Sequence, residues 1–271
     1  MKKRIKKLIA LAVILWSAVL VILIYPSVYQ HICKNRVYEE LEKNIDDNIM
    51  SANLTVATKV TTLEEGYTAP TTSYSLGASG VIIGKDENKY YAITASHVVN
   101  KENCTIYAIP YDGQTIEEYR ESERRLITED YYNQFPTATL EYYDENYDLA
   151  IISFYAEDDF SVLDIADGMP EYKEKIVTIG NPDGKRMLKS YGQVTSKNMI
   201  KYKLDDSKYE VIRHNAYVAP GSSGSAVLNE DMKIVGINIG GTTDGFGRYK
   251  YGVMIPGEVV GKFVECWEEK R

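Results

Sequence analysis

From residue 51 onward the chain is a succession of short apolar or alternating runs separated by turn residues. Such runs, rich in Val, Ile, Tyr and Thr, are typical of β-strands. About a dozen strands at this spacing predict β-barrels or a sandwich. The expected strands are Leu54–Val60, Gly80–Gly84, Tyr90–Thr94, Thr105–Pro110, Thr137–Tyr142, Leu149–Phe154, Lys175–Ile179, Val211–His214, Ser225–Leu228, Ile234–Ile239 and Tyr249–Ile255.

Sustained helical periodicity is limited to two segments. In residues 32–50, apolar side chains recur every four positions and form one stripe, at Val37, Leu41, Ile45 and Ile49. This spacing predicts a short helical stalk that rests on the globular part, since a dimerising coiled coil needs more heptads. The second expected helix is Gly257–Glu268, at the end of the sequence.

The N-terminal segment predicts a membrane anchor. Leu8–Tyr25 is an 18-residue run without charge. As a helix it spans about 27 Å, close to the hydrocarbon thickness of a bilayer. The alternative is a cleaved signal peptide, but its apolar stretch is shorter, and Pro26–Gln30 offers no small-x-small cleavage site. The basic tail, residues 1–7, predicts a cytoplasmic N-terminus and an extracytoplasmic body.

Charge and cysteine content exclude several classes of protein. The formal net charge is -8, although five positive charges lie in the first seven residues. The remainder is therefore still more acidic, which argues against nucleic-acid binding. The three cysteines form no CxxC or Cys/His cluster, so no metal site is expected. Three thiols that are buried or without a special role are the preferred interpretation, and the sequence leaves a Cys104–Cys266 disulfide open.

Pro220–Ser225 is a glycine-rich segment suited to present a serine nucleophile. Ser223 would need an exposed hydroxyl on a tight turn, with backbone N–H groups directed at a developing oxyanion. The N–H groups of Gly221 and Ser223 are the candidates for that oxyanion hole. Taken alone, the hexapeptide is more often an ordinary Gly/Ser loop.

A serine nucleophile requires a base oriented by a carboxylate. His97 follows an apolar strand and is the candidate base. His31 lies just after the apolar span and is expected on the surface, whereas His214 lies in a strand-like run and either lines a pocket or is structural. Asp148 directly precedes the apolar run 149–154 and is preferred as the acid over Asp144, which lies further from that strand.

At this point the sequence resembles a known family. TASHVV, DLAII, IGNPDG, PGSSGSAV and VGINIGG occur in the order and spacing of trypsin-like serine peptidases, particularly the bacterial HtrA/Deg branch. The resemblance covers residues 51–268 and implies a catalytic triad of His97, Asp148 and Ser223. It implies an all-β, chymotrypsin-like fold of two six-stranded β-barrels, at 51–165 and 166–271, after a transmembrane helix (8–25) and a stalk (26–50).

Chain order argues against two rival serine hydrolases. An α/β-hydrolase runs serine, acid, histidine, but no histidine follows Ser223. A subtilisin-like enzyme places its acid before its histidine, the reverse of the order here.

Some positions depart from the family pattern. Ser222 precedes the nucleophile where this branch usually carries Asn, which could loosen the oxyanion loop. By resemblance the primary specificity pocket involves Tyr217, Val218 and Asn238, none of them charged, so a small or medium apolar P1 residue is expected. His214 would alter this expectation if it points into the pocket. No PDZ-like segment follows, so behaviour tied to that domain is not expected.

The leading hypothesis is a membrane-anchored, extracytoplasmic serine endopeptidase of a bacterium. It would cleave polypeptide substrates through an acyl-enzyme and need no metal or organic cofactor. The alternative is a catalytically silent trypsin-like binding or sensor module at the membrane surface. The oligomeric state and the natural substrate remain open.

Overall fold

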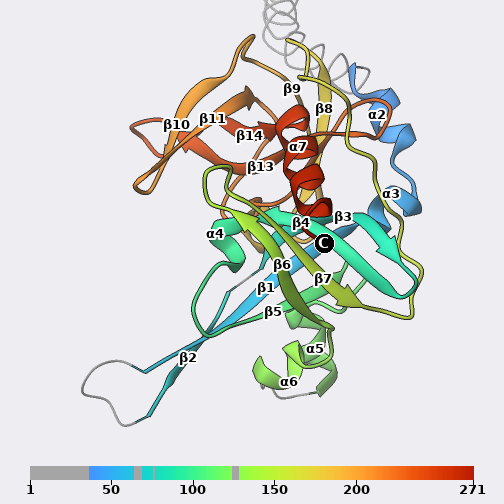
Figure 1. Ribbon diagram of the computed structural model, residues 1–271, viewed down its shortest axis with the longest axis vertical. Coiled ribbons are helices and arrows are strands. Elements are labelled where there is room, and N and C mark those ends of the chain that lie inside the picture. Colours follow the sequence, from blue (N-terminus) through green and yellow to red (C-terminus); the bar gives the residue numbers. More distant parts are fainter. Residues whose placement is uncertain (1–36, 64–68, 76, 124–127) are drawn as a thin grey trace, which may run out of the picture. The chain divides into compact units, whose positions relative to one another are not determined.

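The computed structural model describes residues 37–63, 69–75, 77–123 and 128–271 (Figure 1). The chain divides into two compact units, Met1–Lys43 and Asn44–Arg271, and the second unit contains both β-sheets. The predicted basic tail, the membrane helix and the first part of the stalk lie outside the described residues. Within the described ranges, no helix combines the length and the apolar character needed to cross a membrane.

The first sheet is a closed antiparallel barrel with strand order β1-β3-β4-β7-β6-β5, because β5 returns to pair with β1. Its strands are β1 (Asn53–Thr62), β3 (Ala78–Asp86), β4 (Lys89–Ala95), β5 (Cys104–Pro110), β6 (Thr137–Asp144) and β7 (Leu149–Tyr155). A seventh strand, β2 (Thr71–Tyr74), pairs with the far end of β1, and the two extend away from the barrel as a ribbon (Figure 1). The expectation of a six-stranded barrel is confirmed here.

The second sheet has seven strands in the order β10-β11-β14-β13-β12-β8-β9. They are β8 (Lys175–Gly180), β9 (Leu188–Gln193), β10 (Ile200–Leu204), β11 (Ser207–His214), β12 (Ala226–Leu228), β13 (Ile234–Thr243) and β14 (Tyr249–Pro256). A closed six-stranded barrel was expected, but β9 and β10 do not pair with each other. Instead a single bridge, Val194–His214, brings the chain just after β9 to the end of β11. The second sheet is therefore a half-barrel, because β10 pairs only with β11.

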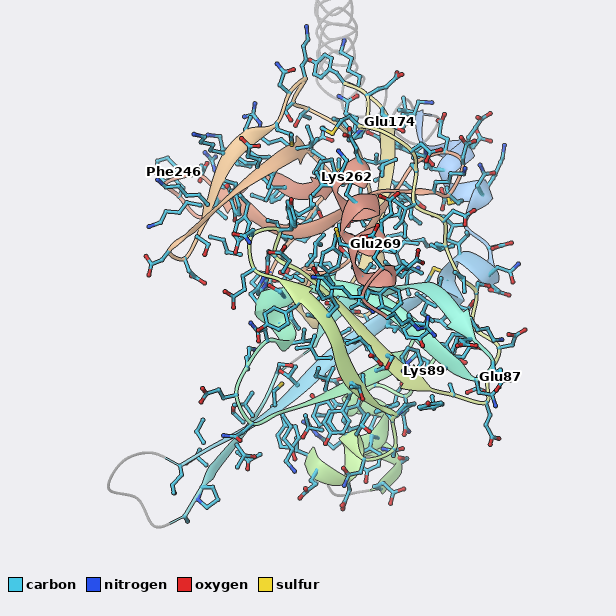
Figure 2. All side chains as sticks on the ribbon, in the orientation of Figure 1. Glu87, Lys89, Glu174, Phe246, Lys262 and Glu269 are labelled. Atoms are coloured by element: carbon cyan, nitrogen blue, oxygen red, sulfur yellow. The ribbon has the colours of Figure 1, made fainter. Side chains whose placement is uncertain are left out.

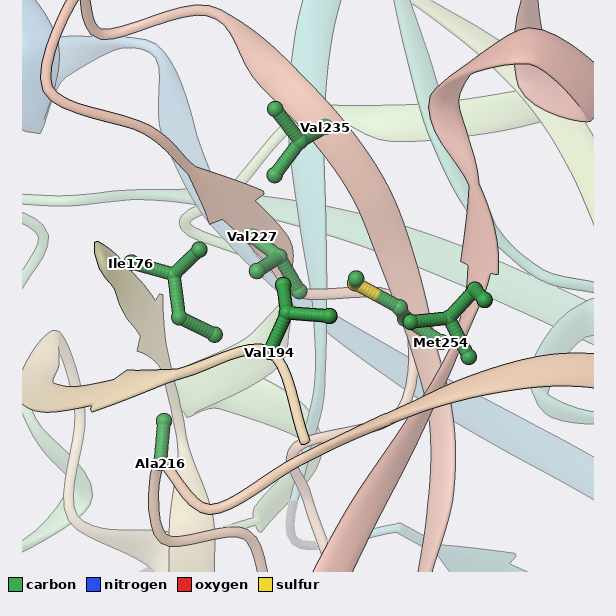
Figure 3. Close-up of a cluster of buried hydrophobic side chains, with 7 residues drawn as sticks. Ile176, Val194, Ala216, Val227, Val235 and Met254 are labelled. Carbon is green, nitrogen blue, oxygen red and sulfur yellow. The ribbon is translucent and has the colours of Figure 1, made fainter. Parts of the chain in front are cut away.

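Apolar side chains fill the interior of the second sheet (Figure 3). Five strands contribute one residue each and two residues lie in loops, and the cluster consists of Ile176, Val194, Ile212, Ala216, Val227, Val235 and Met254. All seven are at most 3% exposed. Burying each Val, Ile or Met side chain of this cluster contributes about 1.5–3 kcal/mol, so the cluster stabilises the half-barrel without strand closure.

The C-terminal helix α7 (Gly257–Glu268) confirms the predicted helix and connects the two sheets. It follows β14 directly and contacts β13 and β14 of the second sheet. Its aromatic side chains reach the first sheet, where the Trp267 and Tyr91 ring centroids are 5.0 Å apart and those of Phe263 and Tyr142 are 5.2 Å apart. This packing fixes the two sheets relative to each other.

The stalk differs from the single helix predicted from its apolar stripe. The described part contains two short helices, α2 (Glu39–Asn44) and α3 (Asp47–Ser51). Asp46 separates them: its backbone is extended, and its side chain accepts a hydrogen bond from the Ile49 N–H. Asp is a strong N-cap residue, so it ends one helix and begins the next despite the continuous apolar spacing.

All eleven expected strands are present, while several short elements were not anticipated. The additional strands are β2, β9 and β10, and the additional helices are α4 (Ser96–Val99), α5 (Ile116–Glu123) and α6 (Thr128–Tyr132). The strands β3 and β4 form a hairpin, in which β3 ends at Asp86 and β4 begins at Lys89. Figure 2 shows Glu87 at the outer end of this hairpin, where its φ of 53° makes the turn.

Candidate active site

His97 and Asp148 are brought together by the register of two neighbouring strands. In the antiparallel pair β4–β7, Ala95 at the end of β4 lies opposite Leu149 at the start of β7. The one-turn helix α4 (Ser96–Val99) begins directly after Ala95, and His97 is its second residue. Asp148 immediately precedes Leu149. The His97 Nδ1 atom is therefore 2.7 Å from the Asp148 Oδ2 atom, although 51 positions separate them in the chain.

The Asp148 carboxylate is fully buried, at 0% exposure, and its oxygens are satisfied by neighbouring donors. Its Oδ1 accepts from the His97 backbone N–H at 2.9 Å and from the Ser96 hydroxyl at 3.0 Å, while its Oδ2 faces His97 Nδ1. Because an ionised carboxylate only accepts, a neutral His97 must carry its proton on Nδ1. The other ring nitrogen, Nε2, is then free to accept a proton.

Asp144, the rival acid, has a different role. Its Oδ1 accepts from the backbone N–H and from the side-chain amide of Asn146, both at 2.8 Å, within the turn between β6 and β7. It makes no hydrogen bond with His97 among the described residues. The structure thus pairs His97 with Asp148 and leaves Asp144 as a turn residue.

Ser223 lies in the loop between β11 and β12, and we call residues 219–225 the Ser223 loop. Two cavities, of about 630 and 270 Å³, both border on His97, Pro220 and Ser223. Ser223 and His97 therefore face a common cleft, although no hydrogen bond joins their side chains in the described part of the chain. His31, the remaining histidine at the N-terminal end, lies outside the described residues.

Two glycines give the Ser223 loop its sharp course. Gly221 and Gly224 have φ angles of 100° and 85°, a region that side-chain-bearing residues rarely adopt. A Cβ at Gly221 would lie 2.2 Å from the Asn181 carbonyl oxygen, and one at Gly224 would lie 2.1 Å from the Ser79 carbonyl oxygen. Both positions therefore require glycine.

Every carbonyl from residue 219 to residue 223 accepts a hydrogen bond from a protein donor. In chain order the donors are the Ser222 N–H, the Asp183 N–H, the Ser79 hydroxyl, the Ser225 N–H and the Ser79 N–H, at 2.8–3.0 Å. No carbonyl of this part of the loop is thus left to turn toward the cleft.

Only two N–H groups of the loop lack an acceptor among the described residues, and they belong to Gly221 and Ser223. The Pro220 carbonyl accepts from the Asp183 N–H at 2.8 Å. Because the C=O and N–H of a trans peptide point in opposite directions, the Gly221 N–H points away from Asp183. These are the two donors that the sequence nominated for an oxyanion hole.

Ser222, the departure from the family pattern, closes its own turn. It is 5% exposed; its N–H donates to the Ala219 carbonyl, and its hydroxyl accepts from the Ala219 N–H at 3.1 Å. The short serine side chain thus satisfies local backbone groups inside the loop.

The four residues nominated for the specificity pocket have different positions. Val218 lines the smaller cavity. Tyr217 is 40% exposed, and its hydroxyl donates to Asp183 at 2.8 Å. His214 and Asn238 are fully buried and joined at 2.7 Å, and neither borders the cavity.

Sequence reasoning missed much of the wall of the smaller cavity. Tyr202 and Leu204 of β10 and Tyr249 of β14 also line it. The alternation of apolar and charged residues in Ile200-Lys201-Tyr202-Lys203-Leu204 could have predicted a strand. It does not indicate that this strand borders the cleft.

The described residues contain no cluster of three or more His, Cys, Asp or Glu side chains arranged to hold a metal ion. Cys104 and Cys266, for which the sequence left a disulfide open, both carry free thiols.

Burial gives His214 an unusual acid–base behaviour. Desolvation lowers the pKa of its imidazole from the ordinary 6.5 to about 4, partly opposed by the hydrogen bond to Asn238. Folded His214 therefore stays neutral down to about pH 4, whereas the unfolded chain protonates it near pH 6.5.

We predict that this histidine makes the fold sensitive to acid. Its contribution is complete above pH 6.5 and is lost as the pH falls toward 4, by about 3 kcal/mol in total. His214→Gln keeps a donor for Asn238. The free energy of unfolding of this variant should fall less over that pH range than the free energy of unfolding of the wild-type protein. Urea unfolding of both proteins at pH 7.5, 5.5 and 4.5 measures the difference, and equal pH slopes would contradict the prediction.

Comparison with known proteins agrees with this architecture. The sequence-family model of the trypsin-like peptidase domain matches residues 78–237. The serine protease Do-like HtrA of Bacillus subtilis strain 168 is 29% identical over 166 residues, which is 59% of this chain and 32% of that protein. A probable periplasmic serine endoprotease, DegP-like, of Buchnera aphidicola is 29% identical over 194 residues, which is 71% of this chain and 35% of that protein.

The match thus spans about a third of the length of these curated relatives. The family model covers more than half of the chain, and its range includes His97, Asp148 and Ser223. The chain therefore belongs to the trypsin-like peptidase family, in its HtrA branch.

Proposed function

We propose that this chain is a serine endopeptidase in which His97, Asp148 and Ser223 form the catalytic triad. The observation that carries the proposal is the contact at 2.7 Å between His97 and the buried Asp148, because His97 borders the same cleft as Ser223. Serine proteases among the relatives support the same activity.

In the proposed mechanism, His97 Nε2 removes the proton from the Ser223 hydroxyl while Oγ attacks the scissile carbonyl carbon. Asp148 holds the imidazole in the required tautomer and stabilises the imidazolium. His97 then protonates the leaving amine, which departs as the acyl-enzyme forms. Water, deprotonated by His97, attacks the ester and releases the acid product together with the free serine.

The oxyanion formed in each half of the reaction needs hydrogen-bond donors that are already in place. We assign this role to the N–H groups of Gly221 and Ser223, which have no other acceptor among the described residues. Removing one such donor typically lowers kcat about 10²–10³-fold. The activity should therefore depend strongly on the conformation of the Ser223 loop.

A fluorophosphonate probe tests the proposed nucleophile. An activated serine attacks its phosphorus and expels fluoride, and His97 takes the proton. We expect the full-length protein in detergent to gain one probe on Ser223 by peptide mass spectrometry, and Ser223→Ala to gain none. Asp148→Asn should label about 10⁴-fold more slowly, because the imidazole loses its tautomer.

Asp144→Asn is the matched control, since it changes a carboxyl group in the same turn and keeps an acceptor for Asn146. It should label at nearly the wild-type rate. A folded wild-type protein that does not react would favour the silent binding or sensor module instead.

The smaller cavity supports an uncharged P1 residue. Its lining contains apolar and hydroxyl side chains, including Val218, Ile239 and Thr242, and no Asp, Glu, Lys or Arg. A charged P1 side chain would lose its hydration there without gaining a partner. We expect digestion of a proteome-derived peptide library to show cleavage after small or medium apolar residues. Preferred cleavage after Lys, Arg, Asp or Glu would contradict this specificity.

We further propose that residues 8–25 anchor the enzyme in the cytoplasmic membrane with the catalytic unit outside. The length and apolar character of this run and the basic residues before it support the proposal. The full-length protein should stay in the membrane pellet after alkaline carbonate extraction, whereas a variant lacking residues 8–25 should be released. A soluble wild-type protein whose N-terminus starts after residue 25 would show that the run is a cleaved signal peptide.

A further inference from the structure

Ser79, near the start of β3, contacts the Ser223 loop from the opposite sheet. Its hydroxyl donates to the Gly221 carbonyl at 2.8 Å, and its backbone N–H donates to the Ser223 carbonyl at 2.9 Å. One residue of the first barrel thus holds two carbonyls of a loop in the second sheet. We propose that the Ser79 hydroxyl is a positioning group for the oxyanion hole, an inference that rests on the proposed function and deepens it.

The hydroxyl proton of Ser79 has only one direction to take. The Asn181 N–H donates to Ser79 Oγ at 3.0 Å, so the oxygen acts as an acceptor on that side. A serine hydroxyl carries a single proton, which therefore goes to the Gly221 carbonyl. Ser79 is 0% exposed, and its own carbonyl accepts from the Thr94 hydroxyl at 2.7 Å, so every polar group of this residue is already paired.

The Gly221 carbonyl is the point where the loop most needs an external constraint. Gly221 has no side chain to restrict rotation, and its φ of 100° is one of several conformations open to glycine. Its carbonyl belongs to the peptide whose N–H, that of Ser222, closes the turn on the Ala219 carbonyl. Among the described residues, Ser79 supplies the only hydrogen bond to this carbonyl.

Loss of the hydroxyl would leave that partly buried carbonyl without its protein donor, which is unfavourable. Glycine permits the peptide to rotate until the oxygen finds another donor. This rotation would pull the Ser222 N–H away from Ala219 and open the turn. The adjoining Pro220–Gly221 peptide could then leave the orientation in which its N–H serves the oxyanion.

The position of Ser79 also explains how the proposed catalytic base and the oxyanion hole stay aligned with each other. His97 follows β4 and Asp148 precedes β7, both in the first barrel, and β3 pairs directly with β4. The same rigid sheet therefore carries the catalytic base and the group that holds the loop of the nucleophile. The Ser79 contact transmits this alignment to the second sheet.

Ser79→Ala tests the inference through the rate of fluorophosphonate labelling of the full-length protein, since that reaction also places a negative oxygen in the hole. We expect labelling to slow about 10- to 100-fold, less than for the loss of a donor itself. Thermal unfolding checks the fold. The proton NMR resonance of the His97–Asp148 hydrogen bond should be unchanged, because the triad pair lies outside the altered contact.

Ser196→Ala is the matched control. It removes another buried serine hydroxyl that accepts a backbone N–H, that of Arg213 at 2.9 Å, but it does not border the cleft. It should label at the wild-type rate. If Ser79→Ala does not fold, Ser79→Cys replaces the hydroxyl by a slightly larger group that is a weaker donor, and it should also label slowly.

The outcomes separate this inference from the proposed function. Wild-type labelling together with equal labelling of a folded Ser79 variant overturns the positioning role and leaves the enzyme intact. Equal slowing in Ser79→Ala and Ser196→Ala, or loss of the His97–Asp148 resonance, also overturns it, because the effect would then be a general structural one. A wild-type protein that does not label at Ser223 overturns both.

Discussion

The candidate site depends above all on burying one carboxylate. An ionised Asp148 at 0% exposure would be strongly unfavourable without compensation, since an unpaired buried charge costs several kcal/mol. Three donors from two successive residues compensate it: the Ser96 hydroxyl, the His97 N–H and the His97 ring. Because two of these donors belong to His97, satisfying the charge also fixes the orientation of the imidazole. Stability and the geometry needed for a base are thus provided by the same hydrogen bonds.

The Ser223 loop has the opposite requirement, because its backbone N–H donors at Gly221 and Ser223 have to stay free of protein acceptors. A buried backbone normally pairs its polar groups. Two N–H groups of this loop have no acceptor among the described residues, and the carbonyls around them are held by other donors. Ser79, Asp183 and Ser225 supply those constraints, and Gly221 and Gly224 allow the backbone to follow them. The candidate site is therefore a joint product of both sheets, with His97 and Asp148 next to strands of one sheet and Ser223 in a loop of the other. The packing of α7 across both sheets supports this arrangement.

Much of the fold could be predicted from local patterns, and the failures have physical causes. Apolar runs such as Leu149–Phe154 are buried strands, since burial and β-propensity favour the same structure there. A single stalk helix was expected, but the described part of the stalk forms two short helices, because Asp46 caps the second one and interrupts the run between them. The short strands β2 and β9 carry few apolar residues, and their pairing with neighbours decides their conformation. Closure of the second sheet could not be predicted, because it depends on whether two edge strands meet.

The sequence by itself determined the chemistry available to this protein: one histidine after a strand, one aspartate before another, and a serine between glycines, in the order of a trypsin-like peptidase. Residue types and their order along the chain carry that information, since each local environment is set by a few neighbours. Only the tertiary structure decided which groups meet. The pairing of Ala95 with Leu149, the wall formed by Tyr202, and the Ser79 hydroxyl on Gly221 all join distant parts of the chain. Such contacts follow from strand register and sheet packing, which depend on the whole fold. They therefore cannot be recognised in any short segment of the sequence.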